Sequence, residues 1–448
     1  MNIIFFAIVS IAFTVASYRQ FNWDGEAADS PMSSVGSAMM DAATGSVELA
    51  LGLVGVMALF LGLMKIAEKG GLLVVIARLV RPLMIRLFPE VPANHPAMGA
   101  MIMNMSANAM GLGNAATPFG IRAMEQLNTL NNSKGVATNS MALFLAINTS
   151  SVTLLPTGVI AIRASVGSAD AAGIVPTTLF ATILSTAIAI IVAKLCMCYW
   201  SPAETVRVGG LEDASADANS YPSNIVAKSD NQSSDQREVI ENGGANDVQA
   251  YRPWVTYLAL GCLAAMIPVT VLYGSSVSPW IIPGLMMALL TFGVCKRVNI
   301  YESFVEGAKE GFNVALRIIP YLVAILVAVG MFRSSGAMDL IVVPLGRITE
   351  LFGMPAQALP MALLRPLSGS GAYGIMTSII SDPSIGPDSY TGYLVSTIQG
   401  STETTFYVLA VYFGAVGIKK IRFALIPALL ADVAGVTGAV IACSYLYG

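Results

Sequence analysis

Gln399-Gly-Ser-Thr-Glu-Thr-Thr-Phe-Tyr407 is the stretch that decides the fold. It lies inside Leu394–Ile418, a segment of apolar and small residues in which Glu403 is the only charged side chain. A segment of this length and composition is typical of a membrane-spanning helix. Polar groups are tolerated at membrane depth only where protein shields them, so the cluster around Glu403 predicts a span that is interrupted inside the protein.

A second stretch, Asn148-Thr-Ser-Ser-Val-Thr-Leu-Leu-Pro156, interrupts another charge-free segment, 135–162, in the same way. The two interruptions can be aligned residue by residue. The aligned pairs are Ser150-Ser151 with Ser401-Thr402, and Thr153 with Thr404.

The composition agrees with a membrane protein, because 55% of the residues are hydrophobic and only 11% are charged, whereas soluble domains carry about 25% charge. The net charge of -3 gives no electrostatic basis for nucleic-acid binding. One His and five Cys leave little material for a metal site, so we expect no metal and no other cofactor. The predicted fold class is an all-α polytopic membrane protein.

The order of features in 44–163 recurs in 307–418, which predicts two repeats. Each repeat has an apolar span, an amphipathic segment containing Pro, a hairpin rich in small residues, and an interrupted span. Small residues also favour close helix packing, which is the alternative explanation for the hairpins. In the order first repeat, second repeat, the segments are Thr44–Met64 and Gly311–Phe332, 72–88 and 337–352, 96–121 and 358–380, and 135–162 and 391–416.

A polar segment, 201–252, divides the chain into 1–200 and 253–448. It holds nine acidic and four basic residues without apolar periodicity, which predicts a flexible cytoplasmic linker. No basic residue precedes the apolar N-terminus, so we interpret it as a first span and not as a signal peptide. The further predicted spans are 3–18, 173–193, two helices in 253–295, and 423–446.

Charge in the loops predicts the orientation of the spans. The loop 19–43 has one basic residue against four acidic ones and is expected outside, whereas Lys65 and Lys69 fall inside. The N-terminus is then cytoplasmic. If neither hairpin crosses the membrane, Thr44–Met64 runs inward and Gly311–Phe332 runs outward, so the repeats are inverted. Arg333 and Arg347 would lie outside, against the rule.

Several motifs resemble known families. His95-Pro-Ala-Met-Gly99 and Gly111-Leu-Gly-Asn-Ala-Ala-Thr-Pro118 resemble spore maturation protein A, and Leu364-Arg-Pro-Leu-Ser-Gly-Ser-Gly371 and Gln399–Tyr407 resemble spore maturation protein B. The chain is similar to the two fused. Both belong to the nucleoside-recognition, or Gate, superfamily, which also includes pore regions of concentrative nucleoside transporters. The resemblance implies two inverted Gate-type repeats, each with a re-entrant hairpin and a broken helix, meeting near the membrane midplane.

The expected function is that of a permease of the bacterial inner membrane for a small polar solute, nucleoside-like, or for an ion. The sequence shows no nucleotide-binding loop and no catalytic constellation, so we expect no enzyme and a process driven by a gradient, with sodium or a proton as coupling cation. The expected partners are the solute and the lipid bilayer, and related transporters form homo-oligomers. The alternative is a non-transporting scaffold or regulator of envelope or spore maturation.

The candidate pathway residues are polar side chains in the hairpins and interruptions. Glu403 is expected to bind a cation, a proton or a solute, or else to pair with Arg365. Arg365 would face an anionic solute, or satisfy Glu403 or hairpin carbonyls. The asparagines suit a nucleobase or sugar, or cap half-helices, and the hydroxyls line a pathway, or bond to helix carbonyls. The full set is Asn104, Asn108, Asn114, Asn148, Ser150, Ser151, Thr153, Arg365, Ser368, Ser370, Gln399, Ser401, Thr402, Glu403 and Thr404.

Two further titratable residues have simpler explanations. His95 precedes Pro96 at the start of the first hairpin and is expected to be structural. Asp432 is a second acid inside an apolar span and is expected to pair with Lys419 or Lys420.

Overall fold

The computed structural model describes residues 2–24, 30–111, 113–200 and 280–448, together with 254, 255, 258 and 261. The predicted linker 201–252 and most of the predicted span before Trp280 lie outside the described residues. Within the described residues the backbone is helical, and its only β-type pairing is an isolated bridge between Val136 and Lys420. The all-α prediction is therefore confirmed for this part of the chain.

The helices of the first half are α1 (Asn2–Phe21), α2 (Pro31–Lys69), α3 (Leu72–Leu87), α4 (Pro96–Ala109), α5 (Gly113–Thr129), α6 (Asn139–Thr149), α7 (Thr157–Ser165) and α8 (Ile174–Tyr199). Those after the linker are Trp280–Cys295, α11 (Ile300–Ser334), α12 (Ala337–Thr349), α13 (Leu359–Leu364), α14 (Gly369–Ile380), α15 (Tyr390–Ser401), α16 (Thr405–Ala415) and α17 (Leu425–Tyr447). Two short 3-10 turns, Glu350–Phe352 and Ala356–Ala358, join α12 to α13.

Helix α2 is longer than the span predicted at Thr44–Met64. It begins at Pro31, where Ser30 caps it by accepting a hydrogen bond from Ser33 N at 3.3 Å. Proline is favoured at a first helical position because its missing N–H would have no partner there. The predicted outside loop 19–43 is thus largely helical. The sequence prediction followed the charge-free stretch, whereas the helix continues past it.

Helices α2 and α11, the first helices of the two predicted repeats, pack antiparallel over most of their length. Glycines allow the close approach: a Cβ on Gly311 would lie 2.7 Å from Ala58 Cα, and a Cβ on Gly330 would lie 3.3 Å from Ala38 O. The numbering falls along α2 as it rises along α11. At the α2 C-terminus, Glu306 pairs with Lys69 at 2.5 Å and Lys65 at 3.5 Å.

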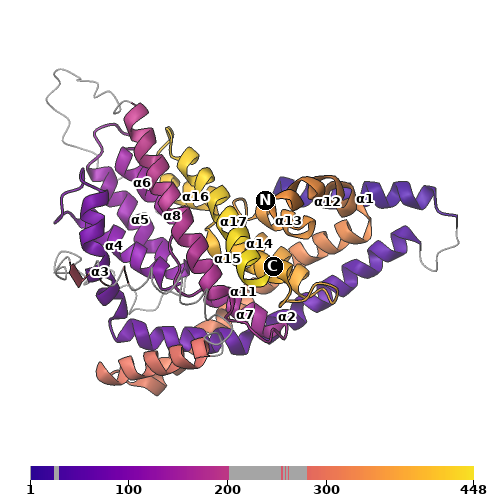
Figure 1. The fold of residues 1–448 in the computed structure, drawn as a ribbon, viewed down its shortest axis with the longest axis horizontal. Helices are drawn as coiled ribbons and strands as arrows, with labels where there is room; N and C mark the ends of the chain where they lie inside the picture. Colours follow the sequence, from indigo (N-terminus) through magenta and orange to yellow (C-terminus); the bar gives the residue numbers. More distant parts are fainter. Residues whose placement is uncertain are drawn as a thin grey trace, which may run out of the picture.

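Helices α8 and α17, which follow the two predicted repeats, also pack antiparallel and lie side by side at the centre of Figure 1. The Ser185 hydroxyl donates to Ala431 O at 2.7 Å, and the Tyr447 hydroxyl donates to Gly173 O at 2.7 Å. Both pairs, α2 with α11 and α8 with α17, are therefore antiparallel.

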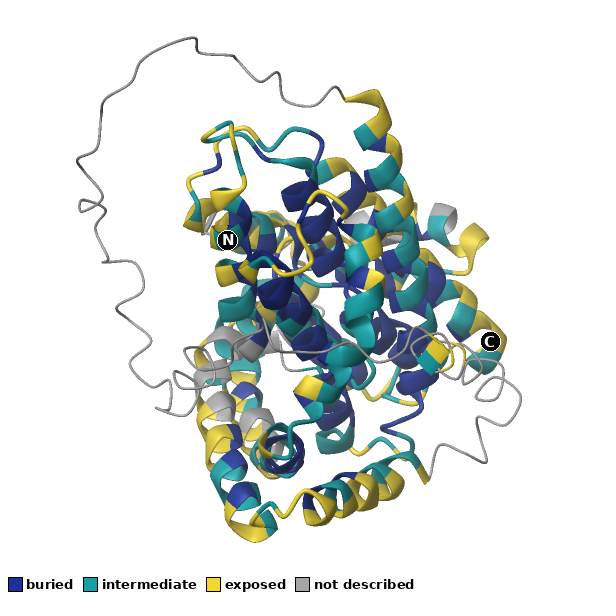
Figure 2. Ribbon diagram, turned by 90° about the vertical axis from the view of Figure 1, so that its left-hand side faces the viewer, coloured by how far each residue is buried: buried dark blue, intermediate teal, exposed yellow. Residues whose placement is uncertain are grey.

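The described helices α8 and α17 are the two that are long and apolar enough to cross a membrane. Shorter apolar helices occupy Phe5–Phe21 and Trp280–Cys295. Buried residues gather inside the helical bundle, and exposed ones lie on its outer surfaces (Figure 2). On α8 and α17 these surfaces carry large apolar side chains, which include Ile191, Leu195, Val433 and Ile441.

The two hairpin candidates are short helix pairs with tight turns. In the first, α4 turns into α5 through Met110 and Gly111. His95 caps α4, because its Nδ1 accepts a hydrogen bond from Ala97 N at 3.1 Å. This contact supports the structural interpretation of His95. In the second hairpin, Ser368 caps α14 by accepting from Gly371 N at 3.0 Å.

Candidate functional site

Both predicted interruptions are present. Helix α6 ends at Thr149 and α7 begins at Thr157, while α15 ends at Ser401 and α16 begins at Thr405. Helix ends leave N–H and C=O groups without partners inside the helix. The chain therefore has two places where polar backbone lies deep in an apolar fold, and their hydrogen bonds decide how they are stabilised.

The two unwound segments touch each other and also the hairpins. Glu403 N donates to Thr149 O at 2.9 Å, which joins the two interruptions directly. Leu154 N donates to Ala109 O at the turn of the first hairpin, at 3.0 Å, and Phe406 N donates to Pro366 O at the turn of the second, at 3.2 Å. Each interruption is thus held by the hairpin of its own repeat and by the other interruption.

Arg365 holds the second interruption in shape. Its guanidinium donates to Thr402 O and, at 3.1 Å, to the Thr404 hydroxyl. The Glu403 carboxylate lies 3.8 Å from the same guanidinium. Arg365 is only 5% exposed, whereas the Glu403 side chain is 45% exposed. Arg365 therefore supports backbone inside the protein, and Glu403 presents a loosely paired carboxylate to the outside of the packed core.

The asparagines form a second cluster around Asn148. Its Oδ1 accepts from Asn108 Nδ2 at 3.0 Å and from the Tyr412 hydroxyl at 3.4 Å. Asn104 Nδ2 donates to the Tyr412 hydroxyl at 3.2 Å and to Ala116 O at 2.8 Å. The cluster joins the first hairpin to both broken helices. Sequence inspection missed Tyr412, although a tyrosine inside an apolar span is itself a signal for a buried polar contact.

Several predicted hydroxyls bond to nearby backbone carbonyls. Ser150 Oγ donates to Ala146 O at 2.8 Å, Ser401 Oγ to Ile398 O at 3.0 Å, and Thr153 Oγ1 to Ser151 O at 3.4 Å. These contacts agree with the alternative of local helix bonding.

The remaining candidates differ in their surroundings. Gln399 is buried, and its Oε1 has no partner among the described residues. Ser151 and Thr402 are buried within the interruptions, while Ser370 is exposed at the start of α14. The side chain of Asn114 lies outside the described residues.

Asp432 does not pair with Lys419 or Lys420, as the sequence interpretation expected. Its carboxylate accepts a hydrogen bond from Thr405 Oγ1 at 2.6 Å, and it is 4% exposed. Asp432 lies in the middle of α17 and Thr405 begins α16. The acid therefore lies behind the second interruption, a position that periodicity alone did not reveal.

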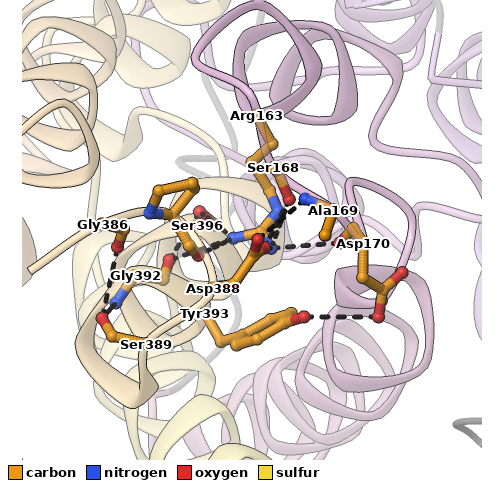
Figure 3. Close-up of polar contacts among 12 residues, drawn as sticks. Arg163, Ser168, Ala169, Asp170, Gly386, Asp388, Ser389, Gly392, Tyr393 and Ser396 are labelled. Carbon is orange, nitrogen blue, oxygen red and sulfur yellow. Dashed lines mark hydrogen bonds and ion pairs between the residues drawn. The ribbon is translucent and has the colours of Figure 1, made fainter.

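A further buried cation, Arg163, lies at the end of α7 and was not among the predicted site residues (Figure 3). It is fully buried and pairs with the Asp388 carboxylate at 2.9 Å. It also donates to Pro387 O at 2.6 Å and to Asp170 O at 3.1 Å. One side chain thus ties the end of the first broken span to the loop before the second.

An aromatic stack completes this Arg163 cluster. The guanidinium lies 4.3 Å from the centre of the Tyr393 ring, which stacks on Tyr447 of α17 at 3.7 Å. A cation over an aromatic face is stabilised electrostatically, more so when it is desolvated. The cluster therefore fastens α7, α15 and α17 together at one end of the bundle.

Comparisons with known proteins place the chain in a family. A nucleoside-recognition family profile, Gate, matches residues 50–166 and 315–419. The chain is 52% identical to spore maturation protein B of Bacillus subtilis over 167 residues, which is 37% of this chain and 93% of the relative. It is 46% identical to spore maturation protein A of Bacillus subtilis over 160 residues, 36% of this chain and 82% of the relative.

The chain therefore belongs to the nucleoside-recognition family that includes spore maturation proteins A and B. Each of these two relatives covers about a third of the chain, consistent with a fusion. A further relative, the inner membrane protein YjiG of Escherichia coli K12, is 30% identical over 88 residues, 18% of this chain and 55% of the relative. No solved structure matches the chain.

Proposed function

We propose that the chain is an inner-membrane permease for a small polar solute, nucleoside-like, or for an ion, driven by a gradient. The observation that carries the proposal is the contact of the two interruptions at Glu403 N and Thr149 O, 2.9 Å apart. In secondary transporters, broken helices that meet inside the protein direct the dipoles of their ends at a solute or ion.

The architecture that supports this function is a pair of inverted repeats with re-entrant hairpins, in the halves 1–200 and 253–448. Two antiparallel pairs support the inversion, α2 with α11 and α8 with α17. In such a protein, alternating access proceeds by movement of one repeat against the other around the site. The proposed orientation has a cytoplasmic N-terminus and linker.

Glu403 is the proposed contact with the transported species. Its carboxylate is 45% exposed, while its neighbours Thr402 and Thr404 are buried. Arg365 donates its hydrogen bonds to Thr402 O and the Thr404 hydroxyl, so its proposed role is to position the segment that carries Glu403.

The first test is solute uptake by Glu403→Gln, which removes the charge and keeps the size. Uptake of a panel of nucleosides, nucleobases and small carboxylates is measured in cells that express the chain, with and without sodium. We expect the variant to reach the membrane in normal amount and to lose at least about tenfold in uptake rate, corresponding to about 1.4 kcal/mol. Glu125→Gln, which alters an exposed carboxylate on α5, is the matched control.

Uptake by Glu403→Gln at the rate of the unchanged chain would refute the role of Glu403. The absence of uptake of any panel member by the unchanged chain would favour a non-transporting scaffold. One observation favours that second function: Asn108, Asn148 and Ser150 direct hydrogen bonds to other groups of the protein. A scaffold would tolerate polar substitutions in both hairpins, which a permease would not.

A further inference from the structure

A cluster of oxygen atoms lies behind the second interruption, away from Glu403. Its centre is Asp432, whose Oδ2 accepts from Thr405 Oγ1 at 2.6 Å. Its Oδ1 is buried and has no partner among the described residues. An ionised carboxylate that is 4% exposed is costly unless a positive charge or donors compensate it. Asp432 therefore needs either a positive charge or a hydrogen-bond donor at Oδ1.

Two serine hydroxyls lie beside the next turn of α17, at Gly435. Ser185 Oγ and Ser401 Oγ each lie 3.5 Å from the position of a Cβ on Gly435, one turn from Asp432 on α17. Both serines are completely buried. Ser185 donates its proton to Ala431 O and Ser401 to Ile398 O. A hydroxyl has one proton and two lone pairs, so their remaining capacity is to accept.

Thr405 is in the same condition, because it donates its proton to Asp432. The hydroxyls of Ser185, Ser401 and Thr405, from α8, α15 and α16, therefore keep lone pairs but no free proton beside Asp432 and Gly435 of α17. A neutral solute that brings both donors and acceptors would be poorly matched. A cation is well matched, since oxygen atoms are the preferred ligands of hard cations.

The charges around the interruption leave a deficit of one positive charge. Arg365 carries one positive charge, whereas Glu403 and Asp432 carry two negative charges when both are ionised. Arg365 lies within 3.8 Å of Glu403, and Asp432 forms no ion pair among the described residues. The helices packed against α17, namely α6, α8, α15 and α16, contain one other charged side chain, Lys194, which donates to Leu87 O at 2.8 Å.

We propose that Asp432, Thr405, Ser401 and Ser185 form a binding site for one monovalent cation, either a sodium ion or a proton. The single carboxylate matches a single charge. Bound there, the cation fixes the ends of α15 and α16 against α17 and α8, and so holds the second interruption in the conformation described. Its role as the coupling ion rests on the proposed permease function, whereas its binding does not.

The test is the thermal stability of the purified full-length chain in detergent. In one arm, sodium chloride replaces choline chloride at constant ionic strength and pH. In the other arm, the pH is varied without sodium. A sodium site predicts a saturable rise of the melting temperature in the first arm. A proton site predicts a rise as the pH falls in the second arm, with no response to sodium.

Asp432→Asn is the decisive variant. The asparagine amide has the size of the carboxylate and can donate hydrogen bonds to the free acceptors, so we expect the variant to fold. If sodium or a fall in pH raises the melting temperature of the unchanged chain, the same change should not raise the melting temperature of the variant. Thr405→Val is expected to raise the half-saturating cation concentration by about tenfold, equivalent to the loss of about 1.4 kcal/mol. Glu125→Gln should keep the response, because Glu125 is exposed on α5 and is not part of the cluster.

The site is refuted if the unchanged chain responds in neither arm, or if Asp432→Asn responds as the unchanged chain does. These results are independent of the permease proposal, which the uptake assay with Glu403→Gln tests. A chain that binds the cation but moves no solute would keep the site and lose the transport function. A chain that transports solute but responds to neither sodium nor pH would keep the transport function and lose the cation site.

Discussion

Arg163 is accommodated without solvent because almost every polar atom around it is used. Its guanidinium contacts the Asp388 carboxylate, three backbone carbonyls and two serine hydroxyls, and only Nε has no partner among the described residues. Removing a charge from water costs several kcal/mol, and good geometry is needed to offset it. The Arg163 cluster therefore depends on its exact set of partners, and loss of the cation should leave them unsatisfied.

We expect Arg163→Met to lower the free energy of unfolding by about 3 kcal/mol. The substitution keeps an apolar stem but leaves Pro387 O and Asp170 O without a donor. Asp388→Asn, at a side chain that is one third exposed, should cost less, because water can replace part of its contacts. The measurement is chemical unfolding in detergent. Equal and small losses in both variants would contradict the account of the cluster.

Asp382, in the loop between α14 and α15, gives a pH-dependent contribution. Burial raises the pKa of its carboxyl, but hydrogen bonds from Ser384 N and Oγ and the ion pair with Arg333 outweigh burial and hold the pKa below its usual value. A lowered pKa means that the ionised form is favoured in the folded state. The stabilisation is therefore present above the unfolded pKa of about 3.9 and is lost as the pH falls through the folded value.

Accordingly, the unchanged chain should be more stable than Asp382→Asn at pH 7, by about 1–2 kcal/mol. The difference should shrink as the pH falls below about 4. Unfolding of both proteins is measured across this range. A constant difference would show that the carboxylate charge does not contribute.

Among residues, the sequence revealed those whose type is unusual for their surroundings. Glu403 and Arg365 stood out because both are charged inside apolar segments; their pairing was the alternative to a functional role of Glu403, and they lie 3.8 Å apart. Arg163 was missed because it stands at the end of a charge-free run and resembles a loop charge. The partners of Asp432 were predicted wrongly, since helix packing decides that α17 faces Thr405 and not Lys419 or Lys420.

At the scale of elements, the first hairpin turn is fitted closely to the first interruption. Gly111 has a φ of +75°, a conformation that glycine adopts without strain. A Cβ there would lie 2.3 Å from Leu155 O. The turn and the unwound segment therefore cannot keep their present distance if any side chain is added at this position.

Gly111→Ala should destabilise the protein by about 2–3 kcal/mol through backbone strain and displacement of the interruption. Gly167→Ala is the matched control, because Gly167 has a φ of +79° and no atom within 4 Å of its Cβ position. It should cost only about 1 kcal/mol. Thermal unfolding of both variants checks the prediction; equal losses would mean that the contact with Leu155 has no energetic weight.

The order of elements could be predicted, but their lengths could not. Charge-free stretches gave the interruptions near Ser150 and Ser401 because polar residues there contrast with an apolar background. Helix α5 continues to Thr129, beyond the hairpin predicted at 96–121, and α11 begins at Ile300, before its predicted span. Hydropathy marks where a helix is apolar, whereas caps and tertiary contacts decide where it ends.

For the whole molecule, the antiparallel pairs α2 with α11 and α8 with α17 connect the two halves without help from the linker. We therefore expect residues 1–200 and 253–448, made as separate chains in one cell, to copurify in detergent. Affinity capture of one tagged half and detection of the other is the measurement. Recovery of each half alone would argue against a shared core.

Close packing at one glycine provides the control for this assembly. A Cβ on Gly311 would lie 2.7 Å from backbone atoms of Ala58, whereas a Cβ on Gly284 would meet nothing within 4 Å. Gly311→Leu should reduce copurification by more than about tenfold, and Gly284→Leu should leave it unchanged. If both behave alike, the α2 and α11 contact does not hold the halves together.

The hydrogen bond between Glu403 N and Thr149 O has a consequence for biosynthesis. Each half supplies only one partner of this bond, so a half made in excess would keep an unpaired amide or carbonyl in an apolar interior, at a cost of several kcal/mol. Surplus copies would be substrates for quality-control proteolysis. Synthesis of both halves as one polypeptide gives equal numbers of each, so that neither is in excess.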